Sequence, residues 1–488
     1  SEGGMNYKMV GFVLGRIFLI EAALMLFPIG CAAIYGEWAS IPAFLIPVVI
    51  LLVLGLAASL KSPKDTKIYA RDGLAIVALV WVLLSVFGAL PFIITGEIPS
   101  FVDAFFEMVS GFTTTGSTIL TDVESLSHGI LFWRSFSHWI GGMGVLVFAM
   151  AVLPMTDGRA MHLMRAEVPG PTCGKISSKL SDSAKILYAI YLVMTVIETI
   201  LLCAGGMPLF DALIHAFGTA GTGGFSTHTD SIAWFQSPRL QWIATLFMFL
   251  ASVNSTLLYL FFIKRRVRDV LHDDELRCFL VIFFVAAFSI MGILMYADHM
   301  DFATALRSAF FNTASLQSTT GFSDEDFMKW HPTIWLILSL ISIIGACAGS
   351  TSGGLKSVRV LMVWRLTKAE FKKMLHPHAV LPVRINNTVI TSQTARTVFV
   401  FFVVYFMLIM LSTFAMVAMG LSLLDAFGLA ISSFSNVGPS IGHLIGPLGS
   451  WGVLNDAILW INSFLMLAGR LEIFSLLLPL TPAFWRDE

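Results

Sequence analysis

The feature that most constrains this chain is a short glycine-bearing motif that returns four times. The four versions are Thr114-Thr115-Gly116-Ser117, Thr222-Gly223-Gly224-Phe225-Ser226, Thr319-Thr320-Gly321-Phe322-Ser323 and Asn436-Val437-Gly438-Pro439-Ser440. Their central glycines, Gly116, Gly224, Gly321 and Gly438, are separated by 108, 97 and 117 residues. A period of this length indicates four structural units in one chain.

Each of these glycines follows, at a distance of 13 positions, a residue that can cap a helix. The four residues are Asp103, Asp211, Ser308 and Asp425. Because Asp and Ser side chains accept hydrogen bonds from the free amides of a first turn, we expect them to be N-caps of short helices. A helix of about ten residues spans ~15 Å, half of a bilayer's ~30 Å hydrocarbon thickness. We therefore predict four helices that enter a membrane without crossing it.

The composition agrees with a membrane location. Of the 488 residues, 57% are hydrophobic and only 12% are charged, which indicates a polytopic membrane protein surrounded by lipid. The net charge is -1 and the basic residues fall in a few short loops, so nucleic acid is not an expected partner. The five cysteines are scattered and odd in number, which favours neither a disulfide framework nor a zinc site.

Ten apolar runs are long enough to span a bilayer. They cover residues 9–35, 41–60, 73–95, 132–153, 186–203, 240–263, 278–295, 334–356, 398–421 and 457–480. With ten spans, the Lys- and Arg-rich loops all fall on one side, which the positive-inside rule makes cytoplasmic. Both termini are then expected in the cytoplasm, and the four glycine loops lie toward the outside.

The predicted fold is therefore an all-α polytopic membrane protein. Two leading helices precede four repeats of helix, pore helix, loop and helix around a pseudo-fourfold central pore. The expected divisions are a cloning remnant at 1–4, two leading transmembrane helices at 5–68, and pore repeats at 69–160, 161–265, 266–375 and 376–488.

The loops point to ion chemistry because irregular backbone at membrane depth is tolerated only when it is buried or lines a wet pathway. Rings of carbonyls can replace the hydration shell of a monovalent cation, and glycine allows the backbone angles this needs. The predicted filter residues are Thr114, Thr115, Gly116, Thr222, Gly223, Gly224, Thr319, Thr320, Gly321, Asn436, Val437 and Gly438. The alternative is that the glycines only let helices pack closely, which four loops at matched spacing make less favoured.

Several longer motifs resemble one family over nearly all of residues 5–488. They are GFTTTGST (111–118), GTAGTGGFSTH (218–228), SLQSTTGFS (315–323), SNVGPSIG (435–442), HWIGGMG (138–144), GACAGSTSGGLKSVR (345–359) and GRLEIFSLLLPLTPAFW (469–485). The chain is similar to the Trk/Ktr/HKT superfamily of potassium transporters, and its two leading helices favour the Trk branch.

In that family four filter glycines go with potassium, whereas a serine at the first position goes with sodium. The resemblance therefore implies K⁺ as the transported ion, with no organic cofactor. The fourth loop departs from the pattern, because Asn436 and Val437 stand where the others carry Thr or Gly. Equal coordination by all four units is thus not implied.

A glycine-rich segment interrupts the eighth apolar run. It contains Gly345, Ala346, Gly349, Ser350, Thr351, Ser352, Gly353 and Gly354. Each glycine costs a helix roughly 1 kcal/mol relative to alanine, so we expect the run to unwind there. One interpretation is a flexible break only. The resemblance implies instead an intramembrane loop, residues 345–354, that gates the pore beneath the filter.

Arg470 stands within the last apolar run, where a charge is costly and usually faces a cavity or a partner. Two interpretations stay open: the side chain braces helices by bonding carbonyls, or it faces the pore or the 345–354 segment and limits cation passage. Glu472 lies two residues further on and is a poor partner within one helix.

No sequence motif suggests an enzyme, since Walker A, dinucleotide and nucleophile-elbow patterns are not found. The leading hypothesis is gated, channel-like K⁺ uptake across the plasma membrane. The alternative is a K⁺ symporter coupled to H⁺ or Na⁺, for which Glu21 or Glu198 would be the first candidates as coupling residues. The resemblance implies a homodimer in the bacterial inner membrane, with cytosolic nucleotide-binding TrkA-type regulatory subunits.

Overall fold

The computed structural model describes residues 5–65, 67–144 and 180–486. The predicted remnant at 1–4 and the end of the fourth predicted span lie outside these residues. The predicted all-α class is confirmed for the described residues, where the two short strands β1 (Arg384–Ile385) and β2 (Thr388–Val389) form a single antiparallel hairpin.

Two leading helical spans precede the repeated units. The first consists of α1 (Tyr7–Leu24) and α2 (Leu26–Ile34), and the second of α3 (Ile41–Ser59). Gly15 and Gly55 face each other where α1 packs on α3, and a Cβ on either would approach the other's carbonyl oxygen to 3.0 Å or less. Both spans therefore stand beside the repeats as a tightly packed pair.

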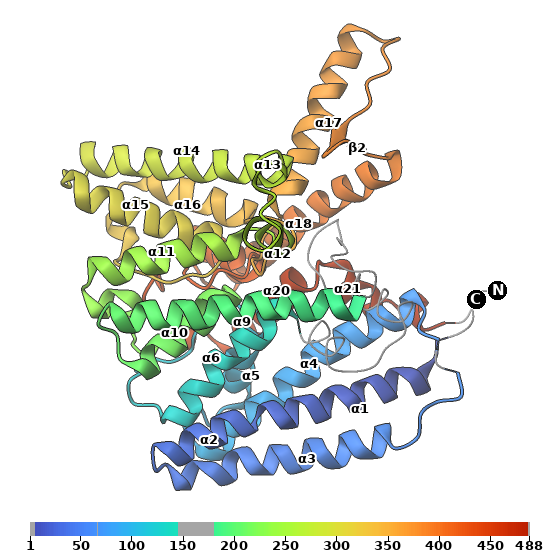
Figure 1. Ribbon diagram of the computed structural model, residues 1–488, viewed down its shortest axis with the longest axis vertical. Helices are drawn as coiled ribbons and strands as arrows, with labels where there is room; N and C mark the ends of the chain where they lie inside the picture. The colour runs from blue at the N-terminus through green and yellow to red at the C-terminus, as the bar shows by residue number, and fades with distance from the viewer. Residues whose placement is uncertain (1–4, 66, 145–179, 487–488) are drawn as a thin grey trace.

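Each of the four units has a first helix, a short inner helix and a second helix (Figure 1). The first helices are α4 (Ala70–Thr95), α9 (Leu180–Ala204), α14 (Asp274–Tyr296) and α18 (Ser392–Ala418). The inner helices are α5 (Phe101–Phe112), α10 (Leu209–Gly221), α15 (Phe302–Gln317) and α19 (Leu423–Phe434). The second helices are α6 (His128–Met143), α11 with α12 (Pro238–Ser252, Ser255–Phe262), α16 with α17 (Pro332–Ile344, Ser357–Leu375) and α20 with α21 (Asp456–Arg470, Phe474–Leu477).

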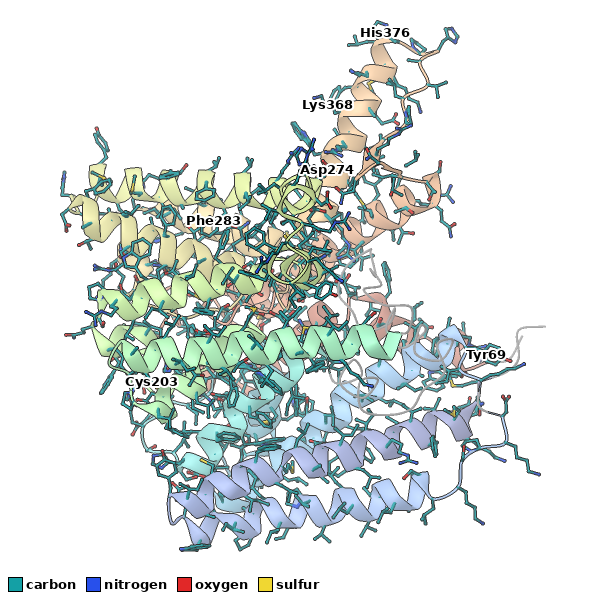
Figure 2. The ribbon with its side chains drawn as sticks, in the orientation of Figure 1. Tyr69, Cys203, Asp274, Phe283, Lys368 and His376 are labelled. Carbon is teal, nitrogen blue, oxygen red and sulfur yellow. The ribbon has the colours of Figure 1, made fainter. Side chains whose placement is uncertain are left out.

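Short elements complete the chain. They are the helices α13 (Val267–Leu271) and α22 (Pro482–Trp485), and 3₁₀ turns at Trp38–Ser40, Ser231–Phe235, Phe327–Lys329, Trp451–Val453 and Leu478–Leu480. Helix α17 and the hairpin after it project from the bundle, and Lys368 and His376 lie along this projection (Figure 2).

The units are joined into a closed ring by their helix contacts. Within each unit, the inner helix packs on the first helix: α5 on α4, α10 on α9, α15 on α14 and α19 on α18. Between units, the second helix packs on the next inner helix: α6 on α10, α11 on α15, α16 on α19 and α20 on α5. The last contact returns to the first unit, so the four inner helices surround one centre.

Six predicted spans correspond to helices long and apolar enough to cross a membrane: Tyr7–Ile34, Trp38–Ser59, Ala70–Thr95, Ser183–Ala204, Asp274–Tyr296 and Ser392–Ala418. The predicted spans at 240–263 and 457–480 are each formed by two helices that meet at a sharp bend. Helices α11 and α12 meet at 106°, and α20 meets the segment Phe474–Leu480 at 118°. Both runs stay apolar through the bend, which is why hydropathy alone did not reveal it.

The predicted N-caps were also wrong. The N-cap positions of the inner helices are held by Ser100, Pro208, Asp301 and Ser422. Asp103, Asp211 and Asp425 lie in the first turn, where a carboxylate is equally favourable near the positive end of the helix. Ser308 lies inside α15, and its hydroxyl donates to Glu325 over 2.7 Å.

Candidate functional site

The four glycine loops share one backbone conformation. We name them loop 1 (residues 114–116), loop 2 (222–224), loop 3 (319–321) and loop 4 (436–438). Their first residues have φ values of 56°, 56°, 60° and 57°, and their glycines have values of 84°, 85°, 82° and 99°. The repeat recognised in the sequence is therefore a repeat of three-dimensional structure.

The first residue of each loop was not expected to be unusual. Three of the four are threonines, and a β-branched residue rarely adopts positive φ. Such a conformation costs on the order of 1–3 kcal/mol and is held in place by its surroundings, most often at functional sites. Asn436 holds this position in loop 4, and asparagine tolerates a positive φ better than threonine does. Asn436 is therefore the one residue whose type could have indicated this conformation from the sequence.

The loops contact each other in a cycle. A Cβ added to Gly116 would overlap the carbonyl oxygen of Gly223, one on Gly224 that of Thr320, and one on Gly321 that of Val437. A Cβ on Gly438 would lie 2.6 Å from the carbonyl oxygen of Thr115, which closes the ring. Each glycine is therefore required twice, for its positive φ and for the approach of the neighbouring loop.

The carbonyls of the loops have no hydrogen-bond donors. None of the twelve carbonyl oxygens in the four loops accepts a hydrogen bond from the residues that the structure describes. Their side chains are buried, with Thr114, Thr222, Thr319 and Asn436 all at 0% exposure. Since buried carbonyls are nearly always paired, twelve unpaired ones around one centre suit a cation that takes the place of the missing donors.

The glycines open onto a cavity at the outer end of the ring. Gly116, Gly224, Gly321 and Gly438 all line this one cavity, together with residues of the loops that follow them. At their other end the loops continue from the carboxyl ends of the inner helices, whose partial negative charge favours a cation.

Loop 4 differs from the others in its side chain and not in its backbone. The Asn436 amide donates to the Thr115 hydroxyl over 3.0 Å and to the Met466 carbonyl over 2.9 Å. It therefore ties loop 4 to loop 1 and to α20. Asn436, which stands where the other loops have Thr, therefore links two units of the ring.

The predicted break in the eighth run is confirmed. Helix α16 ends at Ile344 and α17 begins at Ser357, and the residues between them are not helical. The segment is buried: Ala346, Ser350, Thr351 and Ser352 are each at most 4% exposed. The helix is therefore interrupted by a buried, non-helical segment.

This 345–354 segment contacts the inner ends of the loops. The Thr222 hydroxyl donates to the Thr351 carbonyl over 2.9 Å, and the Gly353 amide donates to the Thr319 hydroxyl over 2.7 Å. A Cβ on Gly353 would overlap the carbonyl oxygen of Ser435. The segment thus lies directly against loops 2 and 3 and against the start of loop 4.

The bend between α11 and α12 is explained by the same segment. The Cys347 amide donates to the Ser252 carbonyl and the Ser255 amide donates to the Gly349 carbonyl, both over 3.1 Å. The backbone groups freed by the bend are therefore paired with the segment, as membrane burial requires. Sequence reasoning also missed Glu275, whose buried carboxylate accepts from the Ala348 amide over 2.6 Å and anchors the segment to α14.

Arg470 bonds carbonyls of two separate elements. Its guanidinium donates to the Thr351 carbonyl over 2.8 Å and to the Gly141 and Gly142 carbonyls over 2.7 and 2.6 Å. It therefore braces the end of α6 and holds the 345–354 segment at the same time. Glu472 pairs with Arg359 of α17 instead, as its spacing from Arg470 suggested.

Two carboxylates with shifted pKa values, Asp324 and Glu124, stand in the segments that follow loops 3 and 1. Burial and then the neighbouring Glu325 raise the pKa of Asp324 to about 7. Its side chain accepts from Asn312 over 2.7 Å. Burial alone would raise the pKa of Glu124, but hydrogen bonds from Thr229 lower it to about 2. Asp324 thus directly follows Ser323 of the cavity wall and has a pKa near neutral.

Comparison with known proteins places the chain among transporters. Residues 40–485 match a family model named TrkH and described as a cation transport protein. The chain is 34% identical over 488 residues to the Trk system potassium uptake protein TrkH of Salmonella typhimurium, covering 99% of this chain and 100% of that protein. It is also 34% identical to TrkG of Escherichia coli, covering 99% of each. The crystal structure of the potassium transporter TrkH from Vibrio parahaemolyticus matches with a TM-score of 0.88 and 32% identity, over 99% of this chain and 100% of that one.

Proposed function

Because the chain belongs to the TrkH family of cation transport proteins, we propose that it takes up K⁺ across the plasma membrane through the ring of four glycine loops. It acts as the membrane subunit of a Trk-type uptake system, with K⁺ as its cargo and no organic cofactor. The relatives it matches over their full length carry names that describe transport, not catalysis.

The unpaired carbonyls of the ring are the observation that carries this proposal. Four loops of equal backbone conformation surround one centre, and their twelve carbonyls have no donors among the described residues. A dehydrated monovalent cation supplies the positive charge that such oxygens lack. The ring acts as a selectivity filter that passes K⁺ in preference to Na⁺.

The 345–354 segment acts as the gate. It is held against the inner ends of the loops by Thr222, Thr319 and Arg470, so ions leaving the filter meet it first. Its glycines allow the segment to change conformation, and its few anchoring bonds can be exchanged when it moves. Opening therefore requires the contacts to Arg470 and Glu275 to loosen.

Uptake of Rb⁺, a K⁺ congener, into proteoliposomes that contain only this chain tests the proposal. We expect uptake down a K⁺ gradient that is inhibited by K⁺ far more strongly than by Na⁺, and that needs no gradient of a second ion. If the chain alone is closed, the same assay is repeated after the cytosolic partner is added. Uptake in neither form, or equal inhibition by Na⁺, would contradict the proposal.

A coupled K⁺ symporter is the second candidate. Glu21 in α1 is 2% exposed and neither of its carboxylate oxygens has a partner among the described residues. A buried, unpaired carboxylate in a membrane span is a candidate for carrying a coupled proton. Rb⁺ uptake that requires a proton or sodium gradient, and loses this requirement in Glu21→Gln, would favour the symporter.

The chain works as a homodimer in the bacterial inner membrane with both termini in the cytoplasm, and it binds a ring of nucleotide-binding TrkA-type subunits. The projecting helix α17 supports a docking role (Figure 2). Trp364 and Phe371 on this helix are each 66% exposed, and Lys368 and Lys372 line a groove beside it. Loss of partner binding in a Trp364→Ala, Phe371→Ala variant that still transports Rb⁺ tests this assignment.

A further inference from the structure

A buried ion pair lies beside the ring and belongs to neither the loops nor the gate. It joins Glu107 of the inner helix α5 to Arg134 of α6, with 2.7 Å between the carboxylate and Nε. Their side chains are 0% and 2% exposed. Because burying two opposite charges is costly and seldom improves stability over apolar side chains, such a pair is worth examining for a specific role.

Glu107 binds the segment that follows loop 1. Its carboxylate accepts from the Thr118 hydroxyl over 2.7 Å and from the Ile119 amide over 3.0 Å. Thr118 is two residues beyond Gly116, so the carboxylate fixes the outer end of the loop to the middle of its own inner helix. Charge-assisted bonds of this kind are short and directional.

Arg134 extends this hold to loop 2. Its Nη1 donates to the Ser226 carbonyl over 3.1 Å, and Ser226 is two residues beyond Gly224. The guanidinium also stacks on the Phe225 ring, 3.7 Å from its centroid, and lines the cavity onto which the glycines open. The pair therefore crosses the seam between loops 1 and 2 just where Gly116 packs against Gly223.

The other units show what is special about this seam. His215 and Asn312 occupy the position of Glu107, nine residues before Gly224 and Gly321. Each binds the segment that follows the loop of its own unit. His215 lies 2.8 Å from the Ser226 hydroxyl, and Asn312 donates to Asp324. The fourth unit has Leu429 at this position. Among these four positions only Glu107 carries a charge matched by an arginine that reaches the next loop.

We propose that Glu107 and Arg134 are positioning residues that set the distance between loops 1 and 2 and thereby the discrimination of K⁺ from Na⁺. This inference rests on the proposed function of the ring. Neither residue belongs to the four loops. Their effect passes through the carbonyls of the two loops, so a change in the pair alters which cation fits rather than whether the protein folds.

The test is a Na⁺ competition assay on Rb⁺ uptake in proteoliposomes, using Glu107→Gln and Arg134→Lys. Both variants keep side-chain length close to the parent's, and Gln keeps one acceptor oxygen where Glu107 uses one oxygen for Thr118 and the other for Ile119. The readout is the ratio of the Na⁺ to the K⁺ concentration that halves uptake. We expect this ratio to fall about tenfold in each variant, with less than additive loss in the double variant because both act through one pair.

Arg365→Lys is the matched control. Arg365 lies on the projecting helix α17, and its Nη1 is 2.8 Å from a carboxylate oxygen of Asp274, so the variant alters an ion pair that is far along the chain from the loops. Its ratio should equal the parent's. A parent that takes up no Rb⁺ contradicts the proposed function itself. Selective uptake by the parent with an unchanged ratio in Glu107→Gln contradicts only the inference. If Arg134→Lys does not accumulate, Phe225→Leu, which removes the ring beneath the guanidinium, replaces it and should lower the ratio as well.

Discussion

The ring of four loops and the 345–354 segment against it are built on opposite plans. In the ring, all four units contribute the same backbone conformation and each glycine meets the next loop's carbonyl. At the inner end, one unit supplies the 345–354 segment, another supplies Arg470, and a third bends between α11 and α12 to receive the segment. Four similar units therefore form one symmetric arrangement and one that has no symmetry.

This difference shows how selection and control can be separated within one chain. A ring of equal loops presents its oxygens on all sides of an ion, which selection requires. A gate needs a segment that can take two positions. A single segment held by a few hydrogen bonds can move more readily than four loops that contact each other. Changes in the ring should alter which ion passes, whereas changes in the gate should alter how often ions pass.

The largest effect is expected from a serine at the ring glycines. Gly116→Ser and Gly321→Ser each combine a strained positive φ with overlap of the neighbouring carbonyl. We expect about hundredfold loss of K⁺-selective Rb⁺ uptake, since left-handed strain alone costs roughly 1–2 kcal/mol. Gly96→Ser controls for the strain, because Gly96 has φ of 76° and no atom within 4 Å of an added Cβ. Equal losses in both would mean that contact between loops is unimportant.

The gate should respond differently. Arg470→Ala removes donors to Thr351, Gly141 and Gly142, which loosens the 345–354 segment without touching the ring. A hydrogen bond from a charged group is worth about 1.5–3 kcal/mol, so flux in the absence of the partner should rise about tenfold or more, with the Na⁺ to K⁺ ratio unchanged. Arg396→Ala, at an exposed arginine of α18, is the control. A fall in the ratio would assign Arg470 to the ring instead.

Asn436→Thr makes loop 4 resemble the other loops in sequence. The variant loses the bonds to Thr115 and Met466 and places a β-branched residue at φ of 57°. We expect Rb⁺ uptake to fall about fivefold, since a left-handed β-branched residue costs roughly 1 kcal/mol. Asn387→Thr, at φ of 65° in the distant hairpin, should leave uptake unchanged. Uptake equal to the parent's would mean that the link between loops 4 and 1 is dispensable.

The smallest effect concerns the carboxylate of Asp324. The raised pKa of Asp324, about 7, means that its carboxylate is ionised above neutral pH and becomes neutral as the external pH falls. Since one charge several ångströms from the pathway is worth only about 0.5 kcal/mol in water, uptake should fall about twofold from alkaline to acidic pH. Asp324→Asn should remove this step, whereas Asp230→Asn, at an exposed residue of the segment that follows loop 2, should retain it. A step that persists in Asp324→Asn would exclude this carboxylate as its source.

Much of the ring could be predicted from the sequence, because a repeated glycine at matched spacing reflects a repeated backbone requirement. The break at 345–354 was also predictable, since glycine weakens a helix wherever it occurs. The first residues of the inner helices could not be predicted. An Asp is favourable both at the N-cap and three residues later, so its fixed distance from Gly116 or Gly438 does not show at which of the two positions it stands. The bend after Ser252 was hidden because its backbone groups are paired with Cys347 and Gly349, which are nearly a hundred residues away.

Anomalous diffraction from crystals of the protein grown in Rb⁺ would locate the path of the ion. We expect Rb⁺ peaks on the ring axis, bounded by the carbonyls of residues 114–116, 222–224, 319–321 and 436–438, and weakened when Na⁺ replaces Rb⁺. Their weakening in Gly321→Ser would follow from the loss of one side of the ring. A ring without Rb⁺ in the parent protein, or peaks only near Glu21 or Glu198, would contradict the assignment of the four loops as the path of the ion.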